Sequence, residues 1–363
     1  MIKLVSDWYK QYFSDQEAVI LLLLLFAIFT VILTMGKFLA PVLTSIVLAY
    51  LLQGIVNVLQ RNGVPRVGAI SIAYAMFIGL LGGFIFGLVP LTVSQFDHFL
   101  NEQLPRIIVE GNNLLKVLPE EYPDLVSQER VNEISLLISS SLSEAVETVV
   151  SFSVTSLPVI IGLLIFLVLV PLLVFFFLKD KDQMTQWVLS FLPEERPFID
   201  TVISEMNVQI ANYVRGKAIE ILIVGAATYI ALMIMGVQYA ALLGLLVGLS
   251  VVIPYIGATI VTIPVALVAY FQFGWSSEFA WVMIVYGLIQ AIDGNVLVPL
   301  LFSEAVNLHP VAIITSVLVF GGLWGVWGVF FAIPLATLVK AMMASWPTLE
   351  EPSNKADWLE GVE

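Results

Sequence analysis

Four acidic residues stand in a long interval of the chain that has no basic residue. No lysine or arginine occurs between Lys217 and Lys340, and the acids in that interval are Glu220, Glu278, Asp293 and Glu304. Within a membrane-spanning run, a carboxylate costs about 2.5–3.5 kcal/mol on insertion scales, so it is expected to face a cavity or a partner. Glu278 stands at the edge of an apolar run and is expected to be an interface residue. The other acids are better candidates for function.

Asp293 has the most informative surroundings. Gln290 and Asn295 complete a set of polar side chains within six residues, and Gly294 and Pro299 follow Asp293 closely. We expect the helix to break here at membrane depth, which would free backbone groups to bind an ion or a polar solute along a transport pathway. The alternative is a helix cap at the membrane surface, because Asp-Gly-Asn is also common in turns.

A second break is expected at Pro254, which removes a backbone hydrogen bond from a helix interior. Tyr255 and Gly257 beside it are further candidates for lining the pathway. Five residues separate Gly248 from Pro254, and the same spacing recurs between Gly328 and Pro334. Interrupted segments at related positions are typical of a transporter's substrate site. The alternative is a chance match between two short patterns.

Glu220 and His309 are the remaining candidates. Glu220 follows Arg215 and Lys217, so it is either a structural ion pair or a second acid for a coupling ion. His309 with Pro310 is either a proton relay or the local structure of a loop-to-helix junction.

Sequence signatures of several enzyme classes are missing. The chain has no cysteine and only two histidines, and it has no phosphate-binding loop, no nucleophile elbow and no His-Glu-x-x-His pattern. We therefore expect no enzyme activity, no cofactor and no metal site.

The amino-acid composition indicates the class of protein to which these residues belong. Of 363 residues, 60% are hydrophobic and 12% are charged, and the mean hydropathy is +0.99. This excludes a soluble globular fold. The net charge of −13 also argues against a nucleic acid partner. Charge-free runs long enough to cross a bilayer predict an all-α polytopic membrane protein with about eight transmembrane segments, including broken or re-entrant helices.

Loop charges orient the first half of the chain. Arg61 and Arg66 lie in a turn without acids, so this turn and the N-terminus are expected in the cytoplasm. The stretch 92–156 holds ten acids against three basic residues and is expected outside, whereas 179–217 carries five basic residues and is expected inside. Because no basic residue lies between Lys217 and Lys340, the excess of basic residues in cytoplasmic loops cannot orient the last third. An even number of crossings is preferred.

These observations predict six regions. They are N-terminal membrane helices 1–91, an acidic helical extracytoplasmic insert 92–156, a membrane helix 157–178, a cytoplasmic amphipathic loop 179–217, a C-terminal membrane region 218–346 with broken helices, and an acidic cytoplasmic tail 347–363. Within the loop, apolar residues recur every four positions from Phe198 to Val214. That pattern predicts a helix that packs on its own protein or lies on the lipid surface.

Several stretches of the chain together resemble the autoinducer-2 exporter family. They are Pro254–Ala258, Asp293–Pro299, Leu308–Pro310, Gly321–Gly328 and Ala332–Lys340, and the likeness extends through Ala40–Leu52 and Val168–Lys181. The resemblance implies a bacterial inner-membrane protein with about eight spans, a soluble insert after the third, and a homo-oligomer, with a pentamer expected. It also implies export of small signalling molecules or exchange of sodium for protons.

The resulting hypothesis is a secondary transporter embedded in the lipid bilayer. It would move a small solute or exchange a monovalent cation for protons, with Asp293 as the leading ion-binding carboxylate. The alternatives are a membrane scaffold that recruits envelope partners through residues 92–156, and an uncoupled channel.

Overall fold

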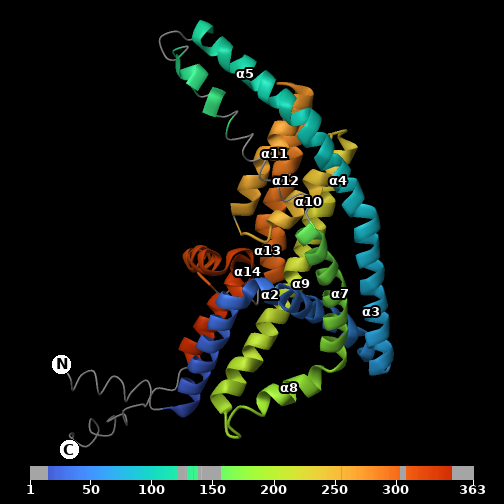
Figure 1. Ribbon diagram of the computed structural model, residues 1–363, viewed down its shortest axis with the longest axis vertical. Helices are drawn as coiled ribbons and strands as arrows, with labels where there is room; N and C mark the ends of the chain where they lie inside the picture. The colour runs from blue at the N-terminus through green and yellow to red at the C-terminus, as the bar shows by residue number, and fades with distance from the viewer. Residues whose placement is uncertain are drawn as a thin grey trace, which may run out of the picture. The chain divides into compact units, whose positions relative to one another are not determined.

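The computed structural model describes residues 15–121, 127, 129–133, 135–137, 140, 157–254, 256–302 and 308–345. All the regular elements in these parts of the chain are helices (Figure 1), which confirms the all-α prediction. They are α2 (Gln16–Arg61), α3 (Arg66–Gly83), η1 (Phe84–Leu88), α4 (Val89–His98), η2 (Phe99–Gln103), α5 (Leu104–Glu121), α7 (Leu157–Lys179), α8 (Lys181–Leu189), α9 (Pro197–Ile234), α10 (Ala240–Ser250), α11 (Ile256–Phe273), α12 (Ser277–Ile292), η3 (Asp293–Leu297), α13 (Val298–Phe302) and α14 (Pro310–Ser345).

Eight segments of the described chain are long and apolar enough to cross a membrane, as the charge-free runs predicted. Two of them, Glu17–Gly36 and Phe38–Arg61, belong to the single helix α2. Exposed leucine, isoleucine, valine and phenylalanine side chains cover these helices, as expected for surfaces that face lipid. The chain is therefore a multi-pass membrane protein.

The chain forms two compact units. The first comprises Met1–Leu43, Asp180–Gly216 and Phe302–Glu363, and the second comprises Thr44–Lys179 and Lys217–Leu301. Each unit draws on segments that are far apart in the sequence.

Two apolar clusters hold the second unit together. One joins α9, α10, α11 and α12 around Val224, Val247 and Val265, and Phe96 and Phe99 pack against it. The other joins the C-terminal half of α2 to α3 and α7. Figure 1 shows α3, α4 and α5 in succession along one rod of helix, so no loop marks the expected region boundary near residue 92. The two π-helical turns η1 and η2 interrupt this rod without ending it.

Glycines allow α9 and α10 to cross at close range. A Cβ atom on Gly248 would lie 2.9 Å from the Cα of Gly225, and one on Gly244 would lie 2.7 Å from the Cβ of Tyr229. Small residues at such crossings let helix backbones approach in a membrane, where packing rather than hydrophobic burial drives association.

The expected interruption at Pro254 is present. Helix α10 ends at Ser250 and α11 begins at Ile256, with Pro254 in the turn between them. At 11 residues, α10 is about 17 Å long, which is too short to cross a hydrocarbon core of about 30 Å. At the start of α11, Gly257 is required because a Cβ atom there would collide with the carbonyl oxygen of Ser250 at the end of α10.

The expected break at Asp293–Pro299 takes a different form. The chain stays helical from Ser277 to Phe302, and Asp293 begins the π-helical turn η3. In a regular α-helix the ring of Pro299 would clash with the carbonyl four residues earlier, and the wider π turn accommodates it.

The first unit is built around α14 and the N-terminal half of α9. Helix α14 breaks at Gly325, where φ is 62° and ψ is −140°. A Cβ atom on Gly328 would collide with the carbonyl oxygen of Phe320, so the two halves of α14 fold back on each other at this point. Val202 and Met206 of α9 are buried against partners that include Leu21 and Leu338, which confirms that the apolar stripe from Phe198 packs on its own protein.

Candidate functional site

A buried ion pair occupies the middle of α9, in the second unit. The Lys217 ammonium donates to the Glu220 carboxylate at 2.7 Å, and also to the carbonyl oxygen of Val251 at 2.7 Å. Lys217 is 4% exposed and Glu220 is 2% exposed. Val251 caps the C-terminus of α10, where backbone carbonyls lack helical partners. Lys217 therefore neutralises a carboxylate and satisfies the end of the short helix α10.

Asp293 brings a second carboxylate to this pair. It is 8% exposed, although its neighbours Ile292 and Gly294 are exposed. Its charge interacts with that of Lys217 and with that of Glu220. Its Oδ1 atom is buried and accepts no hydrogen bond from the part of the chain that the structure describes. When both acids are ionised, the three side chains sum to one negative charge.

A line of polar groups leads along α12 to Asp293. Tyr286, Gln290 and Asp293 are spaced by four and three residues, which places them on one face of the helix. The Tyr286 hydroxyl lies 3.1 Å from the Thr262 hydroxyl of α11. The Gln290 Nε2 group is buried and, within the described ranges, donates no hydrogen bond. Buried polar atoms without a partner are rare and mark places where water or a ligand binds.

The other candidates flanking Asp293 do not join this cluster. Asn295 is exposed, and its Nδ2 group donates to the carbonyl oxygen of Ala291 at 2.8 Å in its own helix. Gly294 is exposed too, and a Cβ atom there would meet no other atom within 4 Å.

The remaining candidates have separate positions. Pro254 lies in the turn that follows Val251, the residue that Lys217 contacts, and Gly257 is the second residue of α11. Tyr255 and Glu304 lie outside the described residues. His309 belongs to the first unit, where its carbonyl accepts from Ala312 at 2.8 Å and its ring accepts from the Val311 backbone at 3.3 Å. With Pro310 as the first residue of α14, His309 is a helix cap.

Sequence reasoning missed three groups at this site. Lys217 was considered only as a loop charge and a neighbour of Glu220, and Tyr286 and Thr262 were not considered. Lys217 had a detectable signal, because it is the last basic residue before the apolar third and has an acid three positions later.

The opposite end of α10 is held by α4. The Gln95 side chain accepts from the Leu242 backbone N–H at 2.9 Å, and His98 Nδ1 lies 2.6 Å from the Tyr239 hydroxyl. Tyr239 adopts φ of 60°, in the left-handed region, at the N-terminus of α10. Burial, and to a smaller extent the Glu102 carboxylate, raises the pKa of Tyr239, so its hydroxyl keeps its proton.

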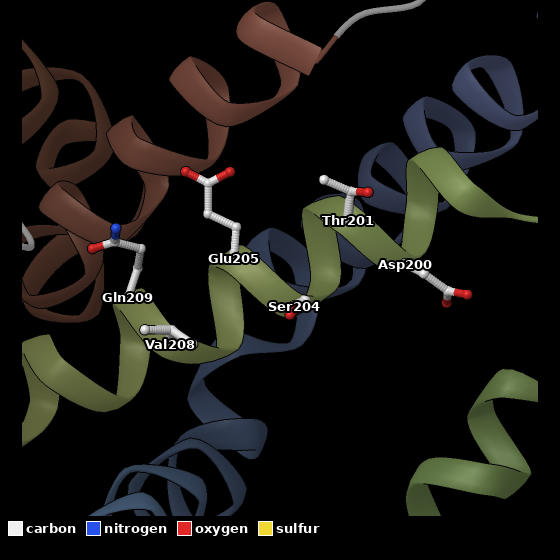
Figure 2. Close-up of a pocket in the computed structure, with 6 residues that line it drawn as sticks. All are labelled: Asp200, Thr201, Ser204, Glu205, Val208 and Gln209. Carbon is white, nitrogen blue, oxygen red and sulfur yellow. The ribbon is translucent and has the colours of Figure 1, made fainter.

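A groove along the N-terminal half of α9 does not form a comparable site. It has a volume of about 620 Å³ and is open to solvent. Within the described chain it is lined by Asp200, Thr201, Ser204, Glu205, Val208 and Gln209. Figure 2 shows that these side chains project from successive turns of the same helix. No second element contributes a facing polar group from among the described residues, so the groove is an exposed helix face.

The comparisons with known proteins agree with the membrane fold. The model of the AI-2E family transporters matches residues 19–348. The permease PerM of Escherichia coli strain K12 is 46% identical over 347 residues, which cover 96% of this chain and 98% of the relative. The Bacillus subtilis transport protein YueF is 27% identical over 306 residues, 83% of this chain and 82% of the relative.

A third relative carries a similar name. The Bacillus subtilis transport protein YrrI is 27% identical over 307 residues, 84% of this chain and 85% of that protein. These relatives are named for transport, which does not support a scaffold role. On the extent of the family match and the identity to PerM, this chain belongs to the AI-2E transporter family.

Proposed function

We propose that the protein is a secondary transporter that moves a small solute, or exchanges a monovalent cation for protons, with Asp293 as its ion-binding carboxylate. The observation that carries the proposal is the buried Oδ1 atom of Asp293, which has no hydrogen-bond partner in the described chain. A carboxylate buried in a membrane-spanning segment is costly, and it is retained where an ion or proton binds. The family membership supports transport as the activity.

The charge balance of the cluster favours a singly charged coupling ion. Lys217 neutralises only one of the two acids, so one proton or one monovalent cation on Asp293 makes the cluster neutral. A divalent cation would leave it positive. Burying a neutral cluster costs far less than burying a net charge.

Lys217 connects the charge state of Asp293 to the short helix α10. With Asp293 neutralised, Lys217 remains with Glu220 and the Val251 carbonyl. With Asp293 ionised, a second carboxylate competes for the same ammonium. A shift of Lys217 toward Asp293 would release the end of α10 and the turn that holds Pro254. Ion binding would thereby change the interrupted segment that we propose lines the solute path.

The test is transport by the purified protein in proteoliposomes, with and without a pH gradient. Asp293→Asn keeps the size and removes the charge, and we expect coupled flux to fall at least about tenfold while the protein remains folded. Glu278→Gln is the matched control, since Glu278 is an exposed acid at the start of the same helical stretch. Unchanged flux in Asp293→Asn would exclude the assignment. A voltage-driven conductance that does not depend on the pH gradient would instead identify a channel.

We further propose the setting in which this transport takes place. The charge distribution of the loops supports a bacterial inner-membrane location with the N-terminus and residues 179–217 in the cytoplasm and residues 92–156 outside. The family resemblance supports a homo-oligomer. A cross-linking ladder of the protein in its membrane tests the oligomer, since a monomer gives a single band.

A further inference from the structure

A second polar site lies in the second unit, in a small cavity away from Asp293. The cavity has a volume of about 180 Å³ and is lined by Gln103, Arg106, Ile107, Glu110, Gln238, Phe271 and Gln272. The lining comes from η2 and α5, from the turn between α9 and α10, and from the end of α11. Three separate stretches of chain therefore converge on it, unlike the groove on α9.

One wall of this cavity is fixed by backbone contacts. The Gln272 side chain accepts from the Gln238 backbone N–H at 2.8 Å and donates to the Gly236 carbonyl at 2.8 Å. Both polar ends of the Gln272 amide are thereby used, and the turn that carries Gln238 is held against the end of α11. A wall that is already ordered lowers the entropy cost of binding.

The opposite wall carries a basic and an acidic side chain that do not pair. Arg106 and Glu110 are one helical turn apart, a spacing that commonly forms an ion pair. Within the described chain, however, the ion pairs are His98–Glu102, Arg196–Asp200 and Lys217–Glu220, and neither Arg106 nor Glu110 is a member of any. Both side chains line the cavity, so a ligand can bridge the gap between them.

From these features we infer that the cavity binds a small zwitterion, with its anionic group on Arg106 and its ammonium group on Glu110. Arginine presents a planar fork of donors that matches a carboxylate or phosphate, and a carboxylate accepts from an ammonium. The Gln103 and Gln238 amides serve the polar remainder of the ligand. A volume of about 180 Å³ has room for a group of the size of a small amino acid or a phosphoethanolamine headgroup.

The same chemistry occurs in two sources, a free amino-acid-like solute and the phosphoethanolamine headgroup of a lipid. The inference that the cavity holds a transport substrate rests on the proposed transport function. The inference that it binds a zwitterion does not depend on transport, so binding is measured by itself, on the full-length protein in nanodiscs. Failure of transport in Asp293→Asn and failure of binding here are then separate results.

The experiment measures binding of glycine, L-serine and O-phosphoethanolamine by saturation-transfer difference NMR. Propionate and ethylamine serve as probes with a single charge. We expect at least one zwitterion to bind at least about tenfold more tightly than either single-charge probe, because only a zwitterion meets both side chains. Arg106→Gln and Glu110→Gln should each weaken that binding about tenfold or more.

Matched controls keep these variants interpretable. Arg130→Gln and Glu133→Gln remove the same charges from exposed positions of the same acidic stretch, outside the cavity, and should leave binding unchanged. Nanodiscs with and without phosphatidylethanolamine separate the two sources. Competition by the lipid identifies the headgroup, and unchanged binding identifies the free solute. Equal affinity of a zwitterion for the parent protein and Arg106→Gln, or absence of zwitterion binding in both nanodiscs, would overturn the inference.

Discussion

At the scale of single residues, Lys217 has more consequences than its acidic partners. It forms the ion pair with Glu220 and donates a hydrogen bond to the carbonyl oxygen of Val251 at the end of α10. Its positive charge also interacts with the carboxylate of Asp293. A buried ion pair offers little net stability over an apolar pair, yet removing one partner leaves an uncompensated charge. Lys217 is therefore the residue whose loss we expect to affect the stability of this cluster most.

We expect Lys217→Met to destabilise the folded protein by about 3–5 kcal/mol, because Glu220 would remain buried without a base. The double variant Lys217→Met, Glu220→Leu should recover part of this loss, since Asp293 is then the one buried carboxylate left in the cluster. Unfolding of detergent-solubilised protein by heat or SDS measures both. Lys181→Met, at an exposed position of α8, is the control and should change the free energy of unfolding by less than about 0.5 kcal/mol.

A stable Lys217→Met variant would contradict the burial of this pair. Equal destabilisation in the single and the double variant would show that the bond to Val251 or the charge left on Asp293, rather than the charge on Glu220, dominates. The two results are distinguishable because only the double variant removes the acid.

The residues of the site were partly predictable from the sequence. Asp293, Gln290 and Glu220 stand out because charged and amide groups are rare in apolar runs. Tyr286 could not be selected in this way, since an isolated tyrosine in an apolar helix has many neutral roles. Asn295, which the same rarity also selected, bonds its own helix at Ala291 and does not join the cluster around Asp293. Sequence spacing gives the face of a helix and does not show what that face contacts.

At the scale of elements, two identical Gly-x5-Pro spacings have different outcomes. Pro254 lies in a turn that separates α10 from α11, whereas Pro334 lies inside α14. The break in α14 occurs instead at Gly325, whose positive φ no other residue type adopts easily. Proline removes a hydrogen bond from a helix, but neighbouring groups in the fold decide whether the helix then ends.

We expect Gly257→Ala to disrupt the turn between α10 and α11. A Cβ atom at this position would meet the Ser250 carbonyl, which is backbone and cannot rotate away. The yield of monodisperse protein after solubilisation should fall several-fold, and transport should be lost. Gly287→Ala is the matched control on the adjacent helix α12, where the added Cβ meets no atom within 4 Å. Alanine there is expected to be neutral or stabilising by up to about 1 kcal/mol.

Normal yield and transport in Gly257→Ala would show that the backbone at this turn can move enough to accommodate a Cβ atom beside the Ser250 carbonyl. A loss in Gly287→Ala as well would show that both helices tolerate no added atom, and the effect could not then be assigned to the turn.

At the scale of the whole molecule, composition predicts the class of protein, and the charge-free runs predict the number of membrane spans. The charge-free runs match the eight candidate membrane spans because each helix must be apolar along most of its length. The division into two units was not predictable, since each unit combines stretches of chain that part of the other unit separates in the sequence. Nor was the orientation of the last third, where basic residues are lacking between Lys217 and Lys340.

The second unit supports an expected orientation for the last third of the chain, where the loop charges give none. The cavity at Arg106 includes Gln238 and Gln272, so the α9–α10 turn and the end of α11 lie beside the start of α5. Because these segments meet around one small cavity, we expect them on the same side of the membrane. If residues 92–156 are outside, the turn before α12 is outside as well, and α12 with α13 runs toward the cytoplasm.

Single cysteines test this orientation directly, because the chain contains none of its own. Asn101→Cys, Ser190→Cys and Ser277→Cys place a thiol at exposed positions of η2, the end of α8 and the start of α12. In right-side-out vesicles we expect a membrane-impermeant maleimide to label the Asn101→Cys and Ser277→Cys variants, and the Ser190→Cys variant only after lysis. The cysteine-free parent controls for background. Labelling of the Ser277→Cys variant together with the Ser190→Cys variant would contradict the shared cavity. If instead the Ser190→Cys variant is labelled in intact vesicles and the other two only after lysis, the orientation derived from loop charges is wrong. That result would still agree with the shared cavity.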